Sequence, residues 1–360
     1  MSQLRRKKVA IIGAGIIGVS TAICLQDSDP SLELTIIADK FSPNTTSDGG
    51  AGLWSCHPGK WVKGSKPEKQ RQWGEGTLHY LKSIIESDIE CNFEMSYITG
   101  YFLYDHIMPE EPALQDIALY YKRLSRDELG KLGFSSDLID GFTTTSVMFP
   151  GTPYLRIKLK QFQKNGGEVI KRKVKSFDEF AGKFDVVVNC TGVGARELCQ
   201  DEEVVPTRGY ILKMDAPWVR HFYYIHRKQE LDAGLATYIF PRFKDVNCWW
   251  NKTQEILDKA SEFEPTIKKA NIMEEWVGLR PVRDHLRLEK EIIEVKTQYG
   301  SKSKLQVVHN YGHGGCGLSL FWGCAEEATN WFIVVVSYEP KVKQSDSIYQ
   351  EYTSMVILIS

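Results

Sequence analysis

Two glycine-rich segments near opposite ends of the 360-residue chain have residue types and spacing suited to binding anions. The first consists of Gly13, Ala14, Gly15, Ile16, Ile17 and Gly18. The second spans residues 311–317 and contains four glycines. Glycine leaves backbone N–H groups uncovered, and at the start of a helix such groups bind negative charge. A nicotinamide cofactor uses only the first kind of turn, so the pair favours FAD, whose far end is electron-rich.

The residues around the first turn predict the elements that a dinucleotide site requires. Residues 9–12 are an apolar strand, residues 16–25 a helix and residues 34–37 a second strand. This β–turn–α–β order is the context that gives the glycine spacing its meaning. Asp39 follows about 20 residues beyond the last glycine, where an acid binds ribose hydroxyls; the alternative is a turn-forming acid.

Composition limits the classes of partner. Lys and Arg (45) balance Asp and Glu (46), and the net charge of −1 predicts neither a nucleic-acid nor a membrane partner. The eight cysteines form no C-x-x-C pair, so we expect reduced intracellular thiols and no metal site. No apolar run approaches the roughly 20 residues that span a bilayer.

The remaining pattern predicts an α/β fold with two domains. Residues 73–86, 116–124 and 154–163 are expected as helices, and residues 97–104, 184–189, 210–214 and 236–240 as strands. The continuous apolar run at 184–189 is typical of a parallel strand buried on both faces. We expect a discontinuous Rossmann-like FAD-binding domain (1–55, 141–204 and 301–335), an α+β substrate domain on a mixed or antiparallel sheet (56–140 and 205–300) and an atypical tail (336–360).

Several segments, in order from residue 9 to about 328, resemble the FAD-dependent D-amino acid oxidases, most closely D-aspartate oxidase. They are residues 13–18, 39–41, 45–54, 187–192, 208–210, 216–218, 277–283, 309–317 and 322–323. The resemblance implies flavin contacts at Asp39, Lys40, Thr46, Ser47, Leu53, Gly314 and Leu318. Their neighbours in the same turns, Thr45, Gly52, Gly192 and Gly317, complete the expected cofactor site.

The resemblance also implies a substrate site. Arg280 matches an arginine that holds the α-carboxylate, Tyr238 a tyrosine near that carboxylate, and Gly315 a backbone carbonyl facing the amino group. A planar guanidinium suits this task because it grips a carboxylate with two charge-assisted bonds. The alternatives are a structural ion pair for Arg280 and a core aromatic for Tyr238. His57 follows the cofactor loop and could reach the substrate, or lie on the surface.

The implied reaction is oxidative deamination of a D-amino acid with dioxygen, giving a 2-oxo acid, ammonia and hydrogen peroxide. His313 is expected to be scaffolding, because this chemistry requires no base. Gly234 stands where neutral-substrate members carry a tyrosine, and Arg227 offers a cation for a second carboxylate. We therefore expect acidic substrates, D-aspartate and D-glutamate. Residues 314–316 favour the alternative, neutral D-amino acids; a nicotinamide dehydrogenase and a catalytically impaired member are further alternatives.

Two regions depart from the family pattern. Residues 247–251 run directly toward a helix near residue 255, so a strand of the substrate sheet is expected to be shortened or missing. Residues 331–336 are strand-like where the final helix should continue. The last residues, Leu358-Ile359-Ser360, are not a peroxisomal address of the S-K-L type, so a cytoplasmic location is expected as well as the peroxisomal one usual for the family.

Overall fold

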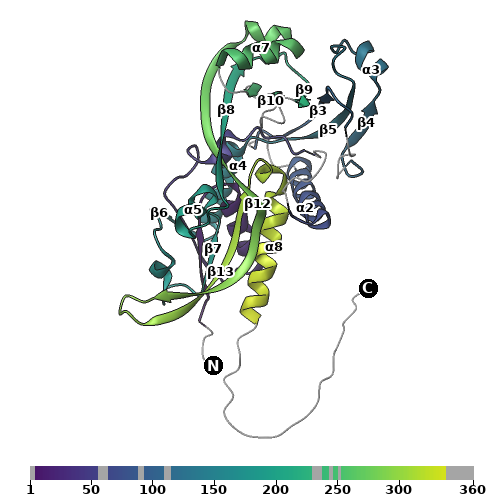
Figure 1. Ribbon diagram of the computed structural model, residues 1–360. Helices are drawn as coiled ribbons and strands as arrows, with labels where there is room; N and C mark the ends of the chain where they lie inside the picture. Colours follow the sequence, from purple (N-terminus) through teal and green to yellow (C-terminus); the bar gives the residue numbers. More distant parts are fainter. Residues whose placement is uncertain are drawn as a thin grey trace, which may run out of the picture.

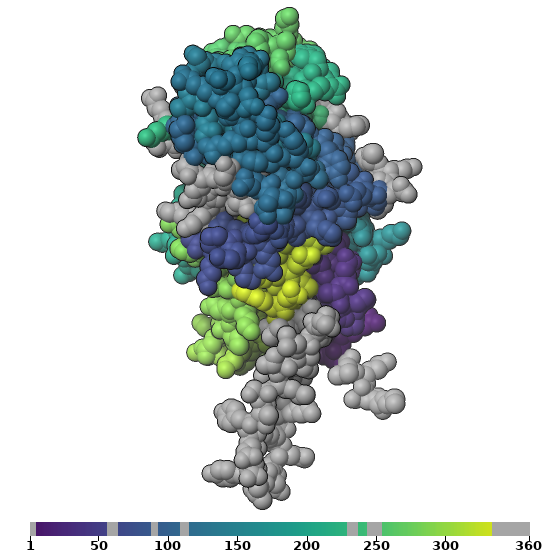
Figure 2. All heavy atoms as spheres, turned by 90° about the vertical axis from the view of Figure 1, so that its right-hand side faces the viewer, coloured from purple at the N-terminus to yellow at the C-terminus, as the bar shows by residue number. Residues whose placement is uncertain are grey.

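The structure is a computed structural model that describes residues 5–55, 64–87, 93–108, 115–228, 237–242, 246–249 and 253–337. These residues form one sheet of 13 strands that is parallel at one end and mostly antiparallel at the other. Figure 2 shows the segments from the two ends of the described chain, purple and yellow, side by side below the blue segments from its first half. Within the described residues, no helix is both long and apolar enough to span a membrane.

The parallel end of the sheet contains the expected nucleotide-binding unit. Across the sheet its strands are β13 (Lys302–His313), β7 (Val186–Asn189), β1 (Lys8–Ile12), β2 (Glu33–Ala38) and β6 (Glu168–Lys171). Helix α1 (Ile16–Ser28) links β1 to β2 and packs against α4 (Gly151–Lys164) and α8 (Gly317–Ser337). Val9 and Ile11 of β1 and Val188 of β7 are buried, as expected for central parallel strands. The predicted β–turn–α–β order is confirmed.

The other end of the sheet is antiparallel, apart from one parallel pair, β3 with β9. Its strands, from the edge inward, are β4 (Tyr120–Leu124), β5 (Asp140–Met148), β3 (Ser96–Tyr104), β9 (Phe222–His226), β10 (Thr237–Pro241), β11 (Val246–Trp249) and β8 (Val205–Asp215). Helices α3 (Arg126–Lys131) and α7 (Thr253–Phe263) lie at this end, whereas α2 (Pro67–Glu86) packs mainly against α8. Short elements complete the described chain: η1 (Thr46–Gly49), η2 (Phe177–Phe180), η3 (Gly192–Gly194), α5 (Ala195–Leu198) and η4 (Pro265–Lys269).

One 26-residue strand, β12 (Asn271–Lys296), joins the two ends of the sheet. Residues 271–282 of β12 pair with β8. Val282 also pairs with His313 of β13, and after a register shift residues 287–296 pair with β13. Figure 1 shows this strand curving along the molecule from α7 at the top to the lower end of the sheet. Arg280 lies just before the change of partner and therefore sits where the two kinds of sheet meet.

Strand β4 corrects the expectation of a helix at residues 116–124. Tyr121 of this strand packs against Phe142 of β5, and Arg123 forms an ion pair with the buried Asp140 at 2.6 Å. These contacts require strand pairing, and tertiary contacts of this kind override the weak local preference for helix. Strand β5 itself lies in the antiparallel end, because it pairs with β3 and β4. Residues 141–148, expected in the FAD-binding domain, therefore belong to a strand of the antiparallel end.

In the two regions that depart from the family pattern, the described residues lie in regular elements. Strand β11 has only four residues, yet it pairs with β10 and β8, so the sheet is continuous across it. Helix α8 continues to Ser337, which corrects the expectation of strand at 331–336. A β-branched residue costs a helix less than about 0.7 kcal/mol, and lengthening an existing helix is easier than starting a new element.

Candidate active site

A cavity of about 850 Å³ lies where the two ends of the sheet meet and collects most of the sequence-predicted site residues. From that set its lining includes Gly13, Ala14, Gly15, Ile16, Ile17, Asp39, Lys40, Thr45, Thr46, Ser47, Gly52, Leu53, Gly192, Tyr238, Arg280, Gly314, Gly315, Gly317 and Leu318. Gly18 is inside α1 and does not line the cavity; a Cβ there would overlap the carbonyl of Gly13. Its role is close packing of the turn.

The first glycine turn has a backbone that accepts no larger residue. Gly13 has φ +109°, and a Cβ at this position would overlap the carbonyl oxygen of Cys190. Gly15 is the N-cap of α1 and has no side chain to bond the first N–H groups of the helix. Gly15, Ile16 and Ile17 line the cavity, so these backbone donors lie at its wall. One donor is already used, since the N–H of Ile16 donates to Ser47 Oγ at 2.9 Å.

A buried aspartate holds the loop that follows β2. Asp48 accepts hydrogen bonds from the backbone N–H and hydroxyl of Thr45 at 2.8 and 2.6 Å. It also accepts one from the Thr152 hydroxyl at 2.9 Å, which ties the loop to α4. The hydroxyl of Thr46 donates to the Leu279 carbonyl of β12 at 3.1 Å. The loop is therefore anchored to both ends of the sheet while Thr45, Thr46 and the residues after them line the cavity.

The charged residues of the cavity lie mostly at its β2 end. Asp39 and Lys40 follow β2 and are exposed. Lys173 forms an ion pair with Glu197 at 2.6 Å, and the pKa of Lys173 is raised first by Glu197 and in smaller part by Asp39. Asp39 therefore lies close to this pair. A carboxylate here suits the ribose hydroxyls of a dinucleotide.

The second glycine turn and the residues near it contain buried polar groups. The N–H of Gly314 donates to the Pro281 carbonyl at 2.9 Å, and α8 begins three residues later. Burial lowers the pKa of His313 to about 3, so its ring is neutral near pH 7. In the described part of the chain, Nε2 of His313, Oδ1 of Asn310 and Oγ of Ser55 are buried without a hydrogen-bond partner, and all three residues line the cavity.

These features of the cavity are suited to binding FAD. Buried polar atoms are rarely left without partners, so three of them around one cavity indicate a polar ligand. The open donors at α1 and the carboxylate at the end of β2 suit a dinucleotide, and the turn before α8 provides the second set of donors at a helix start. The groups that would hold the cofactor therefore come from both predicted turns.

Arg280 reaches the cavity over a glycine of the neighbouring strand. A Cβ at Gly209 would lie 3.0–3.1 Å from the atoms of its guanidinium, so the absence of a side chain at Gly209 makes room for it. Residues 276, 278 and 280 of β12 share one face of the strand, and all three line the cavity. Tyr224 is also close to Arg280. Burial raises the pKa of the Tyr224 hydroxyl to about 12, while the charge of Arg280 lowers this pKa and Cys316 raises it.

Four aromatic residues form the wall around Arg280, and sequence reasoning identified only one of them. Tyr238 stacks on Phe240 with ring centroids 4.6 Å apart, and Tyr224 lies 5.7 Å from Tyr238. Trp276 covers Gly49 and Gly278 so closely that a Cβ at either would overlap its indole. Side chains alternate between the two faces of a strand, and Tyr224 and Tyr238 share one face. This alternation is visible in the sequence, but it identifies the cavity face only once the strand pairing is known.

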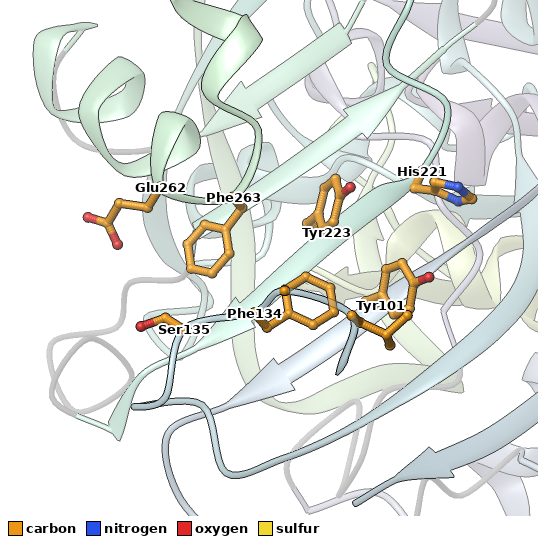
Figure 3. A pocket seen from close by; sticks show the side chains of 9 residues that line it. Tyr101, Phe134, Ser135, His221, Tyr223, Glu262 and Phe263 are labelled. Atoms are coloured by element: carbon orange, nitrogen blue, oxygen red, sulfur yellow. The ribbon is translucent and has the colours of Figure 1, made fainter. Parts of the chain in front are cut away.

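Arg227 lies outside the large cavity. Its guanidinium donates to Glu262 at 2.9 Å and Asp137 at 3.2 Å, and it lies 5.6 Å from the ring centroid of Phe263. Glu262 and Phe263 line a second pocket of about 170 Å³, shown with Tyr223 in Figure 3. Arg227 does not line the large cavity, and two carboxylates already neutralise it. The structure therefore does not bring Arg227, the cation expected for a second substrate carboxylate, to the large cavity. His57 lies outside the described residues.

Arg283 and Arg287 hold the second turn rather than a ligand. Arg283 forms an ion pair with Asp201 at 3.0 Å, and Asp201 also accepts a hydrogen bond from the Tyr311 hydroxyl at 2.7 Å. Arg287 donates to the same hydroxyl at 2.8 Å. This network fixes the strand that leads to His313.

Together, a parallel unit with two anion-binding turns and an antiparallel wall carrying one arginine define a flavin-dependent oxidoreductase. The family model described as FAD dependent oxidoreductase (DAO) matches residues 8–331, and the chain belongs to that family. Human D-aspartate oxidase is 33% identical over 335 residues, covering 89% of this chain and 93% of the relative. D-amino acid oxidase of Dugesia ryukyuensis is 30% identical over 326 residues, covering 89% and 95%.

Solved structures agree on the fold. Glycine oxidase from Geobacillus kaustophilus has a TM-score of 0.66 at 15% identity, covering 94% of this chain and 96% of that one. Iminodiacetate oxidase from Chelativorans sp. BNC1 has a TM-score of 0.64 at 17% identity, covering 93% and 97%. The arrangement of a parallel unit and an antiparallel sheet is therefore shared with other oxidases.

Proposed function

We propose that this protein is an FAD-dependent oxidase that deaminates D-amino acids, producing a 2-oxo acid, ammonia and hydrogen peroxide. The observation that carries the proposal is the position of Arg280, whose guanidinium projects into the same cavity as both glycine turns. An arginine there suits a substrate with a carboxylate next to the reacting carbon. The names of the relatives, D-aspartate oxidase and D-amino acid oxidase, support an amino-acid substrate.

The residues that would hold the cofactor divide between the two turns. The N–H groups at the start of α1 would bind the pyrophosphate, Asp39 the ribose, and the turn before α8 the flavin. Nε2 of His313 and Oδ1 of Asn310 would gain hydrogen-bond partners there. When bound, FAD supplies the two-electron acceptor that the side chains of a protein lack.

The protein's own residues would orient the substrate. Arg280 binds the α-carboxylate, and the Tyr238 hydroxyl adds a hydrogen bond to the same group. The backbone carbonyl of Gly315 accepts a hydrogen bond from the amino group. With the carboxylate and amino groups both held, the α-hydrogen of one enantiomer faces the flavin side of the cavity, and orientation of this kind lowers the barrier without any acid or base. Neutral His313 fits this scheme, because burial lowers its pKa to about 3.

Purified protein tests the proposal directly. We expect a yellow protein that releases peroxide with D-amino acids, while the matching L-amino acids give none. Flavin absorbance and peroxide release are the two measurements, and a heat-released chromophore identifies the cofactor. A folded, colourless protein that cannot be loaded with FAD would contradict the proposal, as would equal rates with both enantiomers.

A further inference from the structure

We propose that the enzyme prefers D-amino acids with neutral, bulky apolar or aromatic side chains over D-aspartate and D-glutamate. This inference rests on the proposed function and specifies its substrate class. Two observations carry it: the aromatic wall beside Arg280, and the distribution of positive charge in the cavity.

The wall beside Arg280 is built from rings on the neighbouring strands β9 and β10 and on β12. Tyr224, Tyr238 and Phe240 are mutually in contact, with ring centroids 4.6 to 5.8 Å apart. Phe102 continues the layer behind Tyr224 at 5.3 Å, so the wall is backed by further aromatic packing. Trp276 and Ile211, which face each other across β12 and β8, extend it along the cavity. Flat apolar side chains gain both buried area and ring contacts on such a surface.

Positive charge is scarce at this end of the cavity. Among the described lining residues, the cations are Lys40, Lys173 and Arg280. Lys40 follows β2, and Lys173 pairs with Glu197 near Asp39, so both belong to the nucleotide end. Arg280 is the lining cation beside the aromatic wall, and one guanidinium binds one substrate carboxylate.

Among the described residues that line the cavity, none besides Arg280 would offer a cation to a second carboxylate at this wall. Arg227, the expected candidate, is held by Asp137 and Glu262 outside the cavity. The sequence of residues 229–236, which joins β9 to β10, contains neither lysine nor arginine. Burying a carboxylate without a cation or full hydrogen bonding is costly, so the side chain of D-aspartate is penalised relative to a neutral one.

The first experiment compares substrates on the wild-type, flavin-loaded protein. D-asparagine and D-aspartate have nearly the same shape and differ in charge, so their kcat/KM ratio isolates the charge effect. We expect D-asparagine to be favoured by at least about tenfold, and D-phenylalanine to exceed D-alanine by about tenfold or more. A preference for D-aspartate over D-asparagine would overturn the inference alone. A flavin-loaded protein that oxidises none of the four would refute the proposed function, and this inference with it.

The second experiment tests the wall with two tyrosines that are neighbours on β9. Tyr224 lines the large cavity, whereas Tyr223 points to the other face of the sheet and lines the small pocket in Figure 3. Tyr224→Leu should reduce the D-phenylalanine to D-alanine ratio of kcat/KM by about tenfold, and the matched control Tyr223→Leu should leave that ratio unchanged.

Tyr224→Phe separates the ring from the hydroxyl. It retains the ring, so the wild-type ratio is expected to persist. Flavin absorbance reports whether each variant is folded, and Phe240→Leu, which shortens the same wall, replaces Tyr224→Leu if that variant does not bind flavin. Equal ratios in the wall variant and in Tyr223→Leu would overturn the assignment of the wall to the substrate side chain.

Discussion

The parallel and antiparallel ends of the sheet build their parts of the cavity in different ways. At the parallel end, turns present backbone groups, and the important residues are small: Gly13, Gly15 and Ser47. At the antiparallel end, strands present side chains, and the important residues are large: Arg280 and Tyr224. The first kind of site tolerates no added atoms, whereas the second tolerates substitution but changes which molecule it accepts. Binding of the cofactor and choice of substrate are therefore expected to be separable by mutation.

Gly13→Ala should cause the largest loss of cofactor binding, because it disrupts the backbone of the first glycine turn. The added Cβ overlaps the Cys190 carbonyl at φ +109°. We expect no bound FAD and a free energy of unfolding lower by about 3 kcal/mol, from backbone strain and overpacking together. Flavin absorbance and chemical denaturation measure the two effects. Gly166→Ala is the control: it has φ +91° with open space around it, and should cost only about 1–2 kcal/mol while keeping FAD. Similar losses in both variants would contradict the role of the overlap.

Arg280→Ala should break the side-chain part of the site while leaving the backbone part intact. Loss of the charged partner of a buried carboxylate costs about 2–5 kcal/mol, so kcat/KM should fall by at least about thirtyfold. The visible spectrum should still show bound flavin. Arg280→Lys should recover only part of the activity, since an ammonium lacks the planar fork. A variant that loses FAD together with activity would show that the two ends of the sheet are not separable.

Gly209→Ala tests a glycine at the antiparallel end, where the missing side chain makes room for the guanidinium of Arg280. The new Cβ would lie 3.0 Å from Cζ of Arg280, and the guanidinium must move by a few tenths of an ångström. We expect a loss of about tenfold in kcat/KM, mostly through KM, with flavin binding unchanged. Steady-state kinetics at saturating oxygen measure it. Wild-type kinetics in this variant would mean that Arg280 does not depend on its position over Gly209.

The last prediction concerns pH and the glycine turn before α8. His313 has a pKa lowered to about 3 by burial, so the unfolded chain binds more protons than the folded one between about pH 3 and 6.5. Stability should therefore fall as pH falls through this window, by at most about 1.4 kcal/mol per pH unit from this group. His313→Gln should flatten that dependence in the flavin-loaded protein. His79→Gln, on the exposed face of α2, should not, and equal slopes in both variants would refute the assignment.

Much of the backbone site could be predicted before the structure. The glycine spacing at residues 13–18, the strands around it and the turn before α8 are local patterns, and the structure places each as expected. Local patterns failed where tertiary contacts decide. Residues 120–124 became a strand through pairing with β5, and residues 331–336 stayed helical within α8.

The aromatic wall beside Arg280 was hidden for the same reason. Tyr224 and Tyr223 are indistinguishable in the sequence, and only the pairing of β9 with β3 and β10 decides which one faces the cavity. Arg227 looked available because its partners, Asp137 and Glu262, are distant in the chain. The amino-acid sequence by itself determined the nucleotide-binding unit, because a tight turn depends on a few adjacent residues. The tertiary structure alone decided the substrate side, because that surface is assembled from strands far apart in the sequence.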